Sequence, residues 1–427
     1  MSSIDNTASG SDGSDRSDDG SGAGLDTEFS AYLGAGGDGH EAVSHGPVHI
    51  EVPDHVGAVL SIDLDAVVSN YQIMQAMSGR AECAAVVKAN AYGLGDAEVI
   101  GALMKQRCKT LFVANLTEAI RARNISSTPD IYVLDGFHPA AIDIYTKYYL
   151  RPVLNSLGDV KAWNELARST GSKPAAAIQL DTGMNRLGLP EYEIAELAKN
   201  PEYLKHFELS LVMSHFACAD DPSHPMNKTQ RALFEHYTAQ LQTEQIAGTR
   251  LSLANSAGVT LGADYLHDMT RVGIALYGGE PSMQTWLDLK PVVTLHARIL
   301  QIHDAEPGES VGYGATQTFT SNRRIATLSA GYADGIFRIL GSSLAKSPSF
   351  GLYRGQKVAL LGRVSMDLIT CDITDIDPEK CGVGDWVELI GKSNTINDIA
   401  ARARTNAYEV LTALGDRYHR IYTQGTD

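Results

Sequence analysis

Short apolar runs alternate with helix-like stretches along the first two-thirds of this chain. Amphipathic stretches such as Asp96–Arg107, Leu157–Ser169 and Met226–Glu244 separate the runs and are expected to be helices. Eight runs of small and β-branched residues are expected to be strands: Ala58–Asp63, Cys83–Lys88, Leu111–Asn115, Ile131–Asp135, Pro152–Asn155, Ala176–Asp181, Glu208–Ser214 and Leu251–Ala254.

Eight strands separated by helices over roughly 230 residues predict an α/β fold, a (β/α)8 TIM-type barrel, whose usual size is about 250 residues. The alternative is an open doubly wound sheet. No GxGxxG segment follows the first strand, and the count of eight favours closure of the sheet into a barrel.

The pattern changes after about Pro291, where β-like runs are separated by Gly, Pro and Asp turns. Short helices are expected only near the end, at Asn397–Arg404 and Tyr408–Leu414. The expected strands are Val292–Ile302, Arg324–Ser329, Lys357–Leu361, Leu368–Ile373 and Trp386–Ile390. This pattern predicts a barrel over residues 57–287 and a mostly β C-terminal domain over residues 288–427.

The first 48 residues form a segment rich in Ser, Gly and Asp. They hold nine acidic residues and one Arg, so nine minus one gives −8, half of the net charge of −16. Such a segment buries too little apolar surface to offset its ordering entropy, so it is expected to be a disordered tail. The tail has neither the basic start and apolar core of a secretory signal nor the Arg-rich character of a transit peptide.

Composition narrows the class of protein further. The 427 residues are 44% hydrophobic and 20% charged, which is ordinary for a globular protein. The acidic balance argues against a nucleic-acid surface, and no apolar run reaches the roughly 18 residues needed to span a bilayer. Five cysteines without CxxC spacing indicate reduced thiols and a cytoplasmic protein.

Lys88 ends the second expected strand, where the buried run opens into a loop. Burying an ammonium without a partner costs several kcal/mol, and a lowered pKa or a covalent bond relieves that cost. Lys88 is therefore a candidate for forming a Schiff base. The alternative is a lysine whose ammonium simply reaches solvent at a strand end.

Other polar residues fall at the same ends of the expected strands, which is where barrels of this kind carry their chemistry. Arg186 follows the sixth strand, His215 the seventh and Ser256 the eighth, and Arg271 comes shortly afterwards. Each has an ordinary structural explanation. Together they match pyridoxal phosphate, which needs an amine, donors for its phosphate, a flat partner for its ring and a group facing the ring nitrogen.

At this point the sequence resembles the alanine racemase family. The resemblance covers residues 57–422, and no metal is implied. Its motifs, in order, are Ala84–Gly93 around Lys88, Asp181–Gly188, Ser214–Phe216, Ala254–Ser256, Arg271–Gly278, Val311–Thr316, Gly331–Gly335 and Met366–Asp367.

The resemblance implies a role for each site residue. Lys88 would hold pyridoxal 5'-phosphate, His215 would pack on its ring, and Arg186 would bond its phenolic oxygen and help bind substrate. The Met366 amide would meet the substrate carboxylate. Arg271 would face the ring nitrogen, and because an arginine keeps its proton, that nitrogen would stay unprotonated and racemisation would be favoured over transamination. The phosphate would be held by Tyr92, Ser256, Gly273 and Ile274.

The resemblance also implies a two-base mechanism in a homodimer. Lys88 would handle the proton on the D side of alanine, and Tyr313 of the other subunit the proton on the L side. The product D-alanine would supply peptidoglycan synthesis. Whether this copy is biosynthetic or catabolic stays open, as do side activity on serine and the strength of the dimer.

Three positions depart from the family pattern. Gln179 stands where many relatives carry a carbamylated lysine; a neutral amide can still orient Arg186, with chloride or water supplying what the amide lacks. Ser365 replaces a frequent cysteine before Met366. Asp416 replaces a frequent tyrosine, for which Tyr418 is not an obvious substitute.

Three other readings stay open. One is a decarboxylase of the same architecture acting on a basic amino acid, but its glycine-rich phosphate loop and Cys-Asp pair are not evident. A second is a racemase with another amino-acid preference. The third is a non-catalytic cofactor-binding protein built on the barrel, against which the β domain with Tyr313 argues.

Overall fold

The computed structural model describes residues 52–241, 248–282, 284–341 and 349–425. All features discussed below belong to the unit formed by His55–Asp427. The acidic tail expected over residues 1–48 lies outside the described residues.

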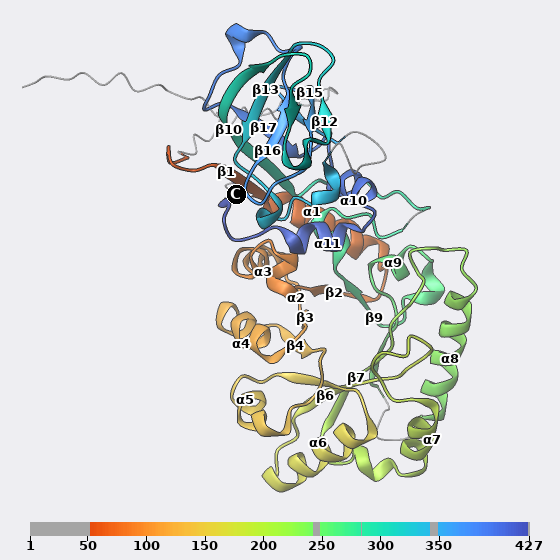
Figure 1. Ribbon diagram of the computed structural model, residues 1–427. Coiled ribbons are helices and arrows are strands. Elements are labelled where there is room, and N and C mark those ends of the chain that lie inside the picture. The colour runs from red at the N-terminus through yellow and green to blue at the C-terminus, as the bar shows by residue number, and fades with distance from the viewer. Residues whose placement is uncertain (1–51, 242–247, 283, 342–348, 426–427) are drawn as a thin grey trace, which may run out of the picture. The chain divides into compact units, whose positions relative to one another are not determined.

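Eight parallel strands form a barrel, as predicted (Figure 1). The ring closes between its last two strands, where Asp268 N donates to Leu251 O (3.0 Å) and Arg271 N donates to Ala254 O (2.9 Å). The strands are β2 (Glu82–Val86), β3 (Thr110–Val113), β4 (Asp130–Val133), β5 (Arg151–Leu154), β6 (Ala175–Gln179), β7 (Glu208–Met213), β8 (Arg250–Ser252) and β9 (Met269–Val272).

The membership of the barrel differs from the expectation at one strand. Ala58–Asp63 was expected to be the first barrel strand, but as β1 it pairs with β10 (Val293–Ala305) and β18 (His419–Thr423) of the second sheet. The eighth barrel strand is instead β9. An apolar run such as β1 satisfies either sheet, and its partners are more than 200 residues away in the chain, so the local pattern does not choose between them. Strand β9 was not predicted because the polar residues Thr270 and Arg271 interrupt its apolar run.

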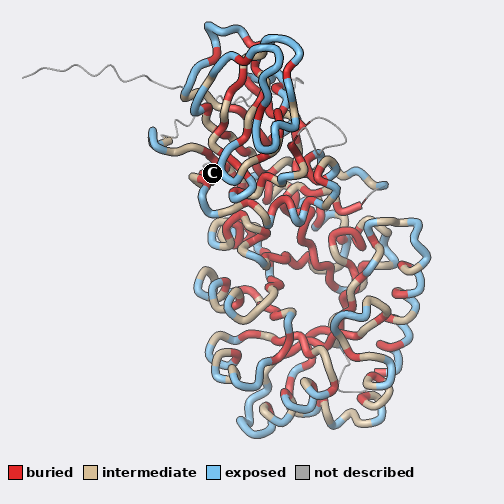
Figure 2. The backbone as a smooth tube through the Cα atoms, viewed as in Figure 1, coloured by how far each residue is buried: buried red, intermediate tan, exposed pale blue. Residues whose placement is uncertain are grey.

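The barrel strands are apolar on both faces because helices cover the outside and side chains fill the inside. Figure 2 shows buried backbone along the strands and exposed backbone around them. The three expected helices are present, within a few residues at their ends. The covering helices are α1 (Leu64–Met77), α3 (Asp96–Lys105), α4 (Leu116–Ile125), α5 (Ile142–Lys147), α6 (Leu157–Thr170), α7 (Glu191–Lys199) and α8 (Met226–Gln240).

Several of these helices begin at a residue whose side chain accepts a backbone N–H of the first turn. Asn115 starts α4 and Ser156 starts α6 in this way. Short helical turns occupy many of the loops: α2 (Lys88–Tyr92), η1 (Pro139–Ala141), η2 (Pro201–Leu204), α9 (Ser256–Val259), η4 (Ala263–Tyr265), η5 (Ile274–Tyr277), η6 (Tyr313–Ala315), η7 (Tyr332–Asp334), η8 (Arg338–Leu340) and η9 (Pro378–Lys380).

The second sheet is mostly antiparallel and contains the five C-terminal strands that were expected. Strand β10 is 13 residues long and pairs with β1, β13 and β17, so the sheet folds back on itself. Its other strands are β13 (Arg323–Leu328), β14 (Phe350–Tyr353), β15 (Gln356–Leu361), β16 (Ile369–Asp372) and β17 (Trp386–Ile390), followed by α10 (Ile396–Ala403) and α11 (Ala407–Ala413). The short strands β11 (Ser310–Val311) and β12 (Gln317–Thr318) pair with each other in a separate two-stranded sheet. The short strands β11, β12, β14 and β18 were not predicted.

Hydrogen bonds join the second sheet to the loop that follows β2. Arg420 Nη1 in β18 donates to Gly93 O (2.7 Å), and Tyr422 Oη donates to Leu94 O (3.0 Å). A Cβ atom on Gly93 would lie 2.8 Å from Leu411 O of α11. The loop after Lys88 is therefore held between the barrel and the C-terminal elements.

Candidate active site

Lys88 lies at the end of the β2 segment, as expected, and opens an unusual turn. Val87 N still donates to Phe112 O of the neighbouring strand (2.9 Å), so the strand geometry extends to the residue before the lysine. Residues 89–92 then have φ of 53°, 56°, 52° and 57°, which makes α2 a left-handed turn that ends at Gly93 with φ 85°. For a residue that is not glycine the left-handed conformation costs roughly 1–2 kcal/mol, so the surroundings must hold this turn in place.

The environment of Lys88 lowers the pKa of its ammonium. Burial is the larger cause, and the positive charge of Arg186 adds to it, whereas Glu118 acts in the opposite direction. A lowered pKa makes the neutral amine available nearer neutral pH, which both imine formation and proton abstraction require. The direction agrees with the prediction made for a lysine at a buried strand end.

The residues expected at the phosphate come together beside this turn. Gly273 N donates to Ser256 Oγ (2.8 Å), and a Cβ atom on Gly273 would lie only 2.2 Å from Tyr92 Oη. The Tyr92 ring stacks on Tyr277 with centroids 4.6 Å apart. Ile274 follows Gly273 and is fully buried. Only glycine at position 273 leaves room for the Tyr92 hydroxyl next to the backbone.

Arg271 is buried in β9 and its guanidinium is surrounded by acceptors. Nη1 donates to Ser252 Oγ (2.5 Å), and Nη2 donates to Ser214 O (2.5 Å) and to Leu253 O (3.3 Å). Burial lowers the pKa of Arg271 to about 9, so the side chain is still charged at neutral pH. Its position is set by backbone and hydroxyl oxygens at the ends of the two neighbouring strands β7 and β8.

His215 lies next to Arg271, with 3.2 Å between His215 Nδ1 and Arg271 Nη2. An arginine has no acceptor atom, so His215 must accept at Nδ1 and carry its proton at Nε2. Burial lowers the pKa of His215 to about 3, and the charges of Arg271, Arg186 and Lys88 act in the same direction. The imidazole is therefore neutral. The charges of Arg271, Arg186 and Lys88 are all close enough to His215 to affect its protonation.

Arg186 is exposed on the loop after β6, and no hydrogen bond of its guanidinium is found within the described residues. Gln179 was expected to orient it. Instead Gln179 Nε2 donates to Leu187 O (2.9 Å), the carbonyl of the next residue in the loop. A neutral amide can bond a neighbouring carbonyl as well as a guanidinium, so Gln179 fixes the loop rather than the arginine side chain.

A buried network next to His215 was missed by the sequence analysis. Gln230 of α8 is fully buried; its Nε2 donates to His215 O (2.9 Å) and to Thr182 Oγ1 (3.2 Å), and its Oε1 accepts from Ala217 N (2.8 Å). The Thr182 hydroxyl is 2.8 Å from Ser214 Oγ. The available signal was helical spacing, since Gln230 falls on the same buried face of α8 as Phe234.

Glu118 is a second residue that was missed. Its Oε1 accepts from Ala89 N (2.8 Å), the residue that follows Lys88, and its Oε2 accepts from Ala114 N (2.8 Å). An acidic residue in the first turn of α4 reads as an ordinary helix start, so nothing in the sequence directed attention to it.

Tyr313 and Met366 lie in loops of the C-terminal part of the chain, and both are exposed, at 70% and 53%. Tyr313 is in the turn between β11 and β12, above a small core that includes Val311 and Phe319. Met366 O accepts from Ala333 N (2.9 Å). In the described chain no hydrogen bond joins either residue to the Lys88 site.

The two C-terminal positions singled out earlier have different surroundings. The Asp416 side chain is fully exposed and lies 3.9 Å from Arg420. Tyr418 is buried and its hydroxyl donates to Asp334 O (2.7 Å), so it does not replace a tyrosine at position 416. A different tyrosine, Tyr408 of α11, has its ring 5.9 Å from that of Tyr92.

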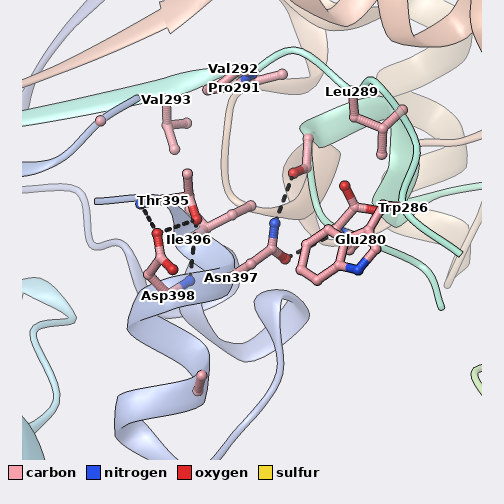
Figure 3. Close-up of a pocket in the computed structure, with 13 residues that line it drawn as sticks. Glu280, Trp286, Leu289, Pro291, Val292, Val293, Thr395, Ile396, Asn397 and Asp398 are labelled. Carbon is pink, nitrogen blue, oxygen red and sulfur yellow. Dashed lines mark hydrogen bonds between the residues drawn. The ribbon is translucent and has the colours of Figure 1, made fainter. Parts of the chain in front are cut away.

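A hollow of about 270 Å³ lies apart from these residues (Figure 3). It is lined by Glu280, Trp286 and Val293 on one side and by the start of α10, including Ile396 and Asn397, on the other. None of the predicted site residues lines it.

Two further findings concern the described ranges only. They contain no group of three or more His, Cys, Asp or Glu side chains that could hold a metal ion. No helix within them has the length and apolar character needed to cross a membrane. The five cysteines are all free thiols.

Comparison with known families assigns both halves of the chain. Residues 62–281 match the model of the alanine racemase N-terminal domain, and residues 292–422 match that of the C-terminal domain. A catabolic alanine racemase of Mesorhizobium japonicum is 42% identical over 370 residues, covering 86% of this chain and 94% of the relative. An alanine racemase of Rhizobium meliloti is 41% identical over 372 residues, covering 86% and 97%.

Solved structures agree with this assignment. Alanine racemase from Bartonella henselae, with covalently bound pyridoxal phosphate, superposes with a TM-score of 0.80 at 38% identity, covering 86% of this chain and 99% of that one. Biosynthetic alanine racemase from Pseudomonas aeruginosa gives a TM-score of 0.76 at 34% identity, covering 86% and 100%. The chain belongs to the alanine racemase family.

Proposed function

We propose that this protein is a pyridoxal 5'-phosphate-dependent racemase that interconverts L-alanine and D-alanine. The observation that carries the proposal is that Lys88, with its lowered pKa, opens the turn in which Tyr92 packs against Gly273, whose amide in turn bonds Ser256. The covalently bound cofactor of the Bartonella henselae relative supports the same assignment.

The residues present fit the cofactor. Lys88 supplies the amine, and the Tyr92 and Ser256 hydroxyls both lie against the Gly273 backbone, where these groups would hold the phosphate. The Ile274 amide would add a donor to the phosphate. When bound, the cofactor draws electron density from the substrate α-carbon and so makes its proton removable.

Around the ring, the proposal gives His215, Arg186 and Arg271 separate tasks. Neutral His215 would pack on the ring, and Arg186 would bond the phenolic oxygen and the substrate carboxylate. Arg271, charged at neutral pH and held by Ser214 and Ser252, would donate to the ring nitrogen and keep it from accepting a proton. Weakening the electron sink in this way limits transamination and leaves racemisation as the favoured outcome.

Two proton carriers are needed because inversion removes the proton from one face of the α-carbon and returns it to the other. Lys88, as a neutral amine, would take the proton of D-alanine. Tyr313 of a second subunit would act on the L face. The exposure of Tyr313 in its own chain supports this role, since its hydroxyl is free to enter a neighbouring barrel.

The active unit in this proposal is a homodimer with shared sites. Several large apolar side chains in the loops between the C-terminal strands are exposed, namely Tyr313, Tyr332, Met366 and Leu368. Such a group of apolar residues is typical of a surface that is covered by a partner. Met366 of the partner would place its amide at the substrate carboxylate.

We further propose a cytoplasmic enzyme with a barrel over residues 57–287 and a β domain over residues 288–427, which supplies D-alanine for peptidoglycan. Strand β1 is the exception within that barrel segment, because it belongs to the second sheet. Relatives include both a catabolic and a biosynthetic enzyme. Loss of this gene product should therefore create a requirement for D-alanine, whereas unimpaired growth with lost use of alanine would assign the catabolic role.

The test is an assay of the purified protein for D-alanine formed from L-alanine, with L-serine and L-lysine alongside. We expect alanine to be converted fastest and no carbon dioxide to be released. Borohydride reduction followed by mass spectrometry should place the cofactor adduct on Lys88, and Lys88→Ala should lose both the adduct and the visible absorbance. An adduct on another residue would overturn the assignment.

A further inference from the structure

Glu118 is the third residue of α4 and makes an ordinary helix-start contact. The Asn115 side chain, which caps α4, accepts from Glu118 N (3.0 Å), and Glu118 Oε2 accepts from Ala114 N (2.8 Å). These bonds satisfy backbone groups where β3 ends and the helix begins.

Helix α6 begins in the same way with a shorter acid. Ser156 caps it and accepts from Asp159 N (3.1 Å), and Asp159 Oδ2 accepts from Asn155 N (3.0 Å). An aspartate at this position therefore suffices for the local contact. The additional methylene of Glu118 is not needed for starting the helix.

The second oxygen of Glu118 reaches a different loop. Oε1 accepts from Ala89 N at 2.8 Å, and Ala89 is the first residue of the left-handed turn that follows Lys88. One carboxylate thus bridges the ends of β2 and β3, and it does so at the amide next to the lysine. The turn is also held by backbone bonds from Ala91 N to Val87 O (3.0 Å) and from Gly93 N to Ala89 O (2.7 Å), and Asn90 Oδ1 accepts from Asp96 N (2.9 Å). Among these contacts, the Glu118 carboxylate is the one that ties the turn to β3.

The charge of Glu118 also acts on the lysine. Among the groups that influence Lys88, burial and Arg186 lower the pKa of the ammonium, and Glu118 raises it. The same side chain therefore affects both the position and the protonation of Lys88.

We propose that Glu118 is a positioning residue of the racemase site, which clamps the strained turn after Lys88 to the end of β3 and so fixes where the lysine side chain enters the barrel. This rests on the proposed function, in which Lys88 holds the cofactor and moves a proton. In this proposal Glu118 acts through the turn after Lys88 and not by binding substrate or cofactor.

The principal test is Glu118→Asp in the full-length holoenzyme. By analogy with Asp159, the shorter acid keeps the Ala114 contact and the charge but does not reach Ala89. We expect the variant to fold, the peptide covering Lys88–Gly95 to exchange its amide hydrogens faster, the circular dichroism of the bound cofactor to weaken, and kcat to fall about 10-fold, as expected for losing one charge-assisted hydrogen bond.

Glu118→Gln separates charge from reach. The amide keeps the length but carries no negative charge, so the pKa of Lys88 should fall, and the acidic limb of the kcat profile, which reports the enzyme–substrate complex in which Lys88 is a free amine, should move to lower pH. Glu118→Asp should leave that limb in place. If Glu118 only stabilised α4, the acidic limb would stay in place in both variants, and hydrogen exchange of the Lys88–Gly95 peptide would be unchanged.

Asp159→Asn is the matched control. It makes the same acid-to-amide change as Glu118→Gln at the matching position of α6, where the carboxylate bonds Asn155 N and not the turn after Lys88, and it should change kcat by less than about 2-fold. Unchanged exchange and cofactor dichroism in both Glu118 variants would overturn the proposal. Hydrogen exchange is measured without substrate, so it tests the contact of Glu118 separately from the activity. If the variants exchange faster but the wild type does not racemise alanine, the proposed function is wrong and the clamping of the turn by Glu118 still stands.

Discussion

At the scale of single residues, the site depends on groups whose charge is set by their surroundings. Lys88 and His215 both have lowered pKa values, chiefly because burial disfavours their charged forms. Arg271 keeps its charge because oxygens of Ser252, Ser214 and Leu253 accept hydrogen bonds from its guanidinium. The site therefore combines a fixed cation with a neutral imidazole and an amine that loses its proton readily.

The lowered pKa of His215 predicts a loss of stability in acid. The folded value is about 3, below the roughly 6.5 of an unfolded histidine, so the unfolded state binds more protons as the pH falls from 7. Between pH 7 and pH 5 this histidine should cost about 2 kcal/mol of unfolding free energy. Urea unfolding of wild type and His215→Asn at both pH values measures it, and the variant should lose less stability.

Half-buried carboxyls act in the opposite direction. Burial raises the pKa of Asp130, for example, so its contribution to stability rises in acid. The comparison with His215→Asn cancels such contributions. An identical pH dependence in the two proteins would contradict the assigned state of His215.

Gly273 gives a prediction for cofactor binding. In Gly273→Ala the new methyl carbon would lie 2.2 Å from Tyr92 Oη, so either the tyrosine or the backbone must move. We expect a cofactor dissociation constant at least about 10-fold higher, and a stability loss of about 1–3 kcal/mol, the usual cost of overpacking. Titration of the cofactor-free protein measures the first and urea unfolding the second.

A matched control for this variant is Gly101→Ala in α3, where a Cβ atom would meet nothing within 4 Å. That change should leave cofactor binding unaltered. Equal affinities in all three proteins would show that the space beside Tyr92 is not the phosphate site.

At the scale of elements, the loops at the barrel mouth are held by residues from neighbouring helices. Gln230 of α8 bonds the backbone on both sides of Phe216 and also the hydroxyl of Thr182, so a single amide connects the loops after β6 and β7. Arg186 and His215 lie on those two loops. The relative position of Arg186 and His215 therefore depends on α8, although Gln230 bonds neither side chain.

Gln230→Met tests this connection, because methionine has the same length and cannot form the three bonds. The unpaired His215 carbonyl and Ala217 amide should lower the free energy of unfolding by about 1–3 kcal/mol. The dichroism of the bound cofactor should weaken as well. Thr238→Val, which removes only hydroxyl bonds within α8 to Phe234 O (2.8 Å) and Glu235 O (3.1 Å), should leave the cofactor signal unchanged.

The elements also show where local pattern is sufficient. Strands of the barrel interior and helices with clear caps, such as α6 after Ser156, follow from apolar periodicity and start signals. Strand β9 was missed because Arg271, one of its four residues, is charged. That charge is tolerated only because Ser214, Ser252 and Leu253, brought in from other strand ends, accept its hydrogen bonds.

At the scale of the whole molecule, the proposed site needs two chains. Tyr313 is exposed and separate from the Lys88 site in its own chain, so neither subunit alone would hold both proton carriers. Replacing Tyr313 by Phe should leave cofactor binding intact and reduce turnover about 100-fold or more, within the range of a general acid–base group.

Mixed dimers distinguish a shared site from a site within one chain. Unfolding and refolding Lys88→Ala and Tyr313→Phe together in equal amounts should give half mixed dimers, each with one complete site. In a symmetric dimer each mixed pair has one complete site out of two. Because half of the dimers are mixed, activity should recover to about a quarter of wild type. Size-exclusion chromatography verifies assembly, and a mixture as inactive as its two components would rule out sharing.

Sequence alone determined the barrel and the β domain after it and supplied the candidate site residues, because buried strands and motifs are formed by residues that are neighbours in the chain. Tertiary structure decided which sheet receives β1, the left-handed turn after Lys88 and the contacts of Gln179, Gln230 and Glu118. Each of these depends on partners far along the chain, or on contacts with other elements that hold a strained backbone in place. A polar side chain with several possible partners takes its partner from the packing, which no local pattern encodes.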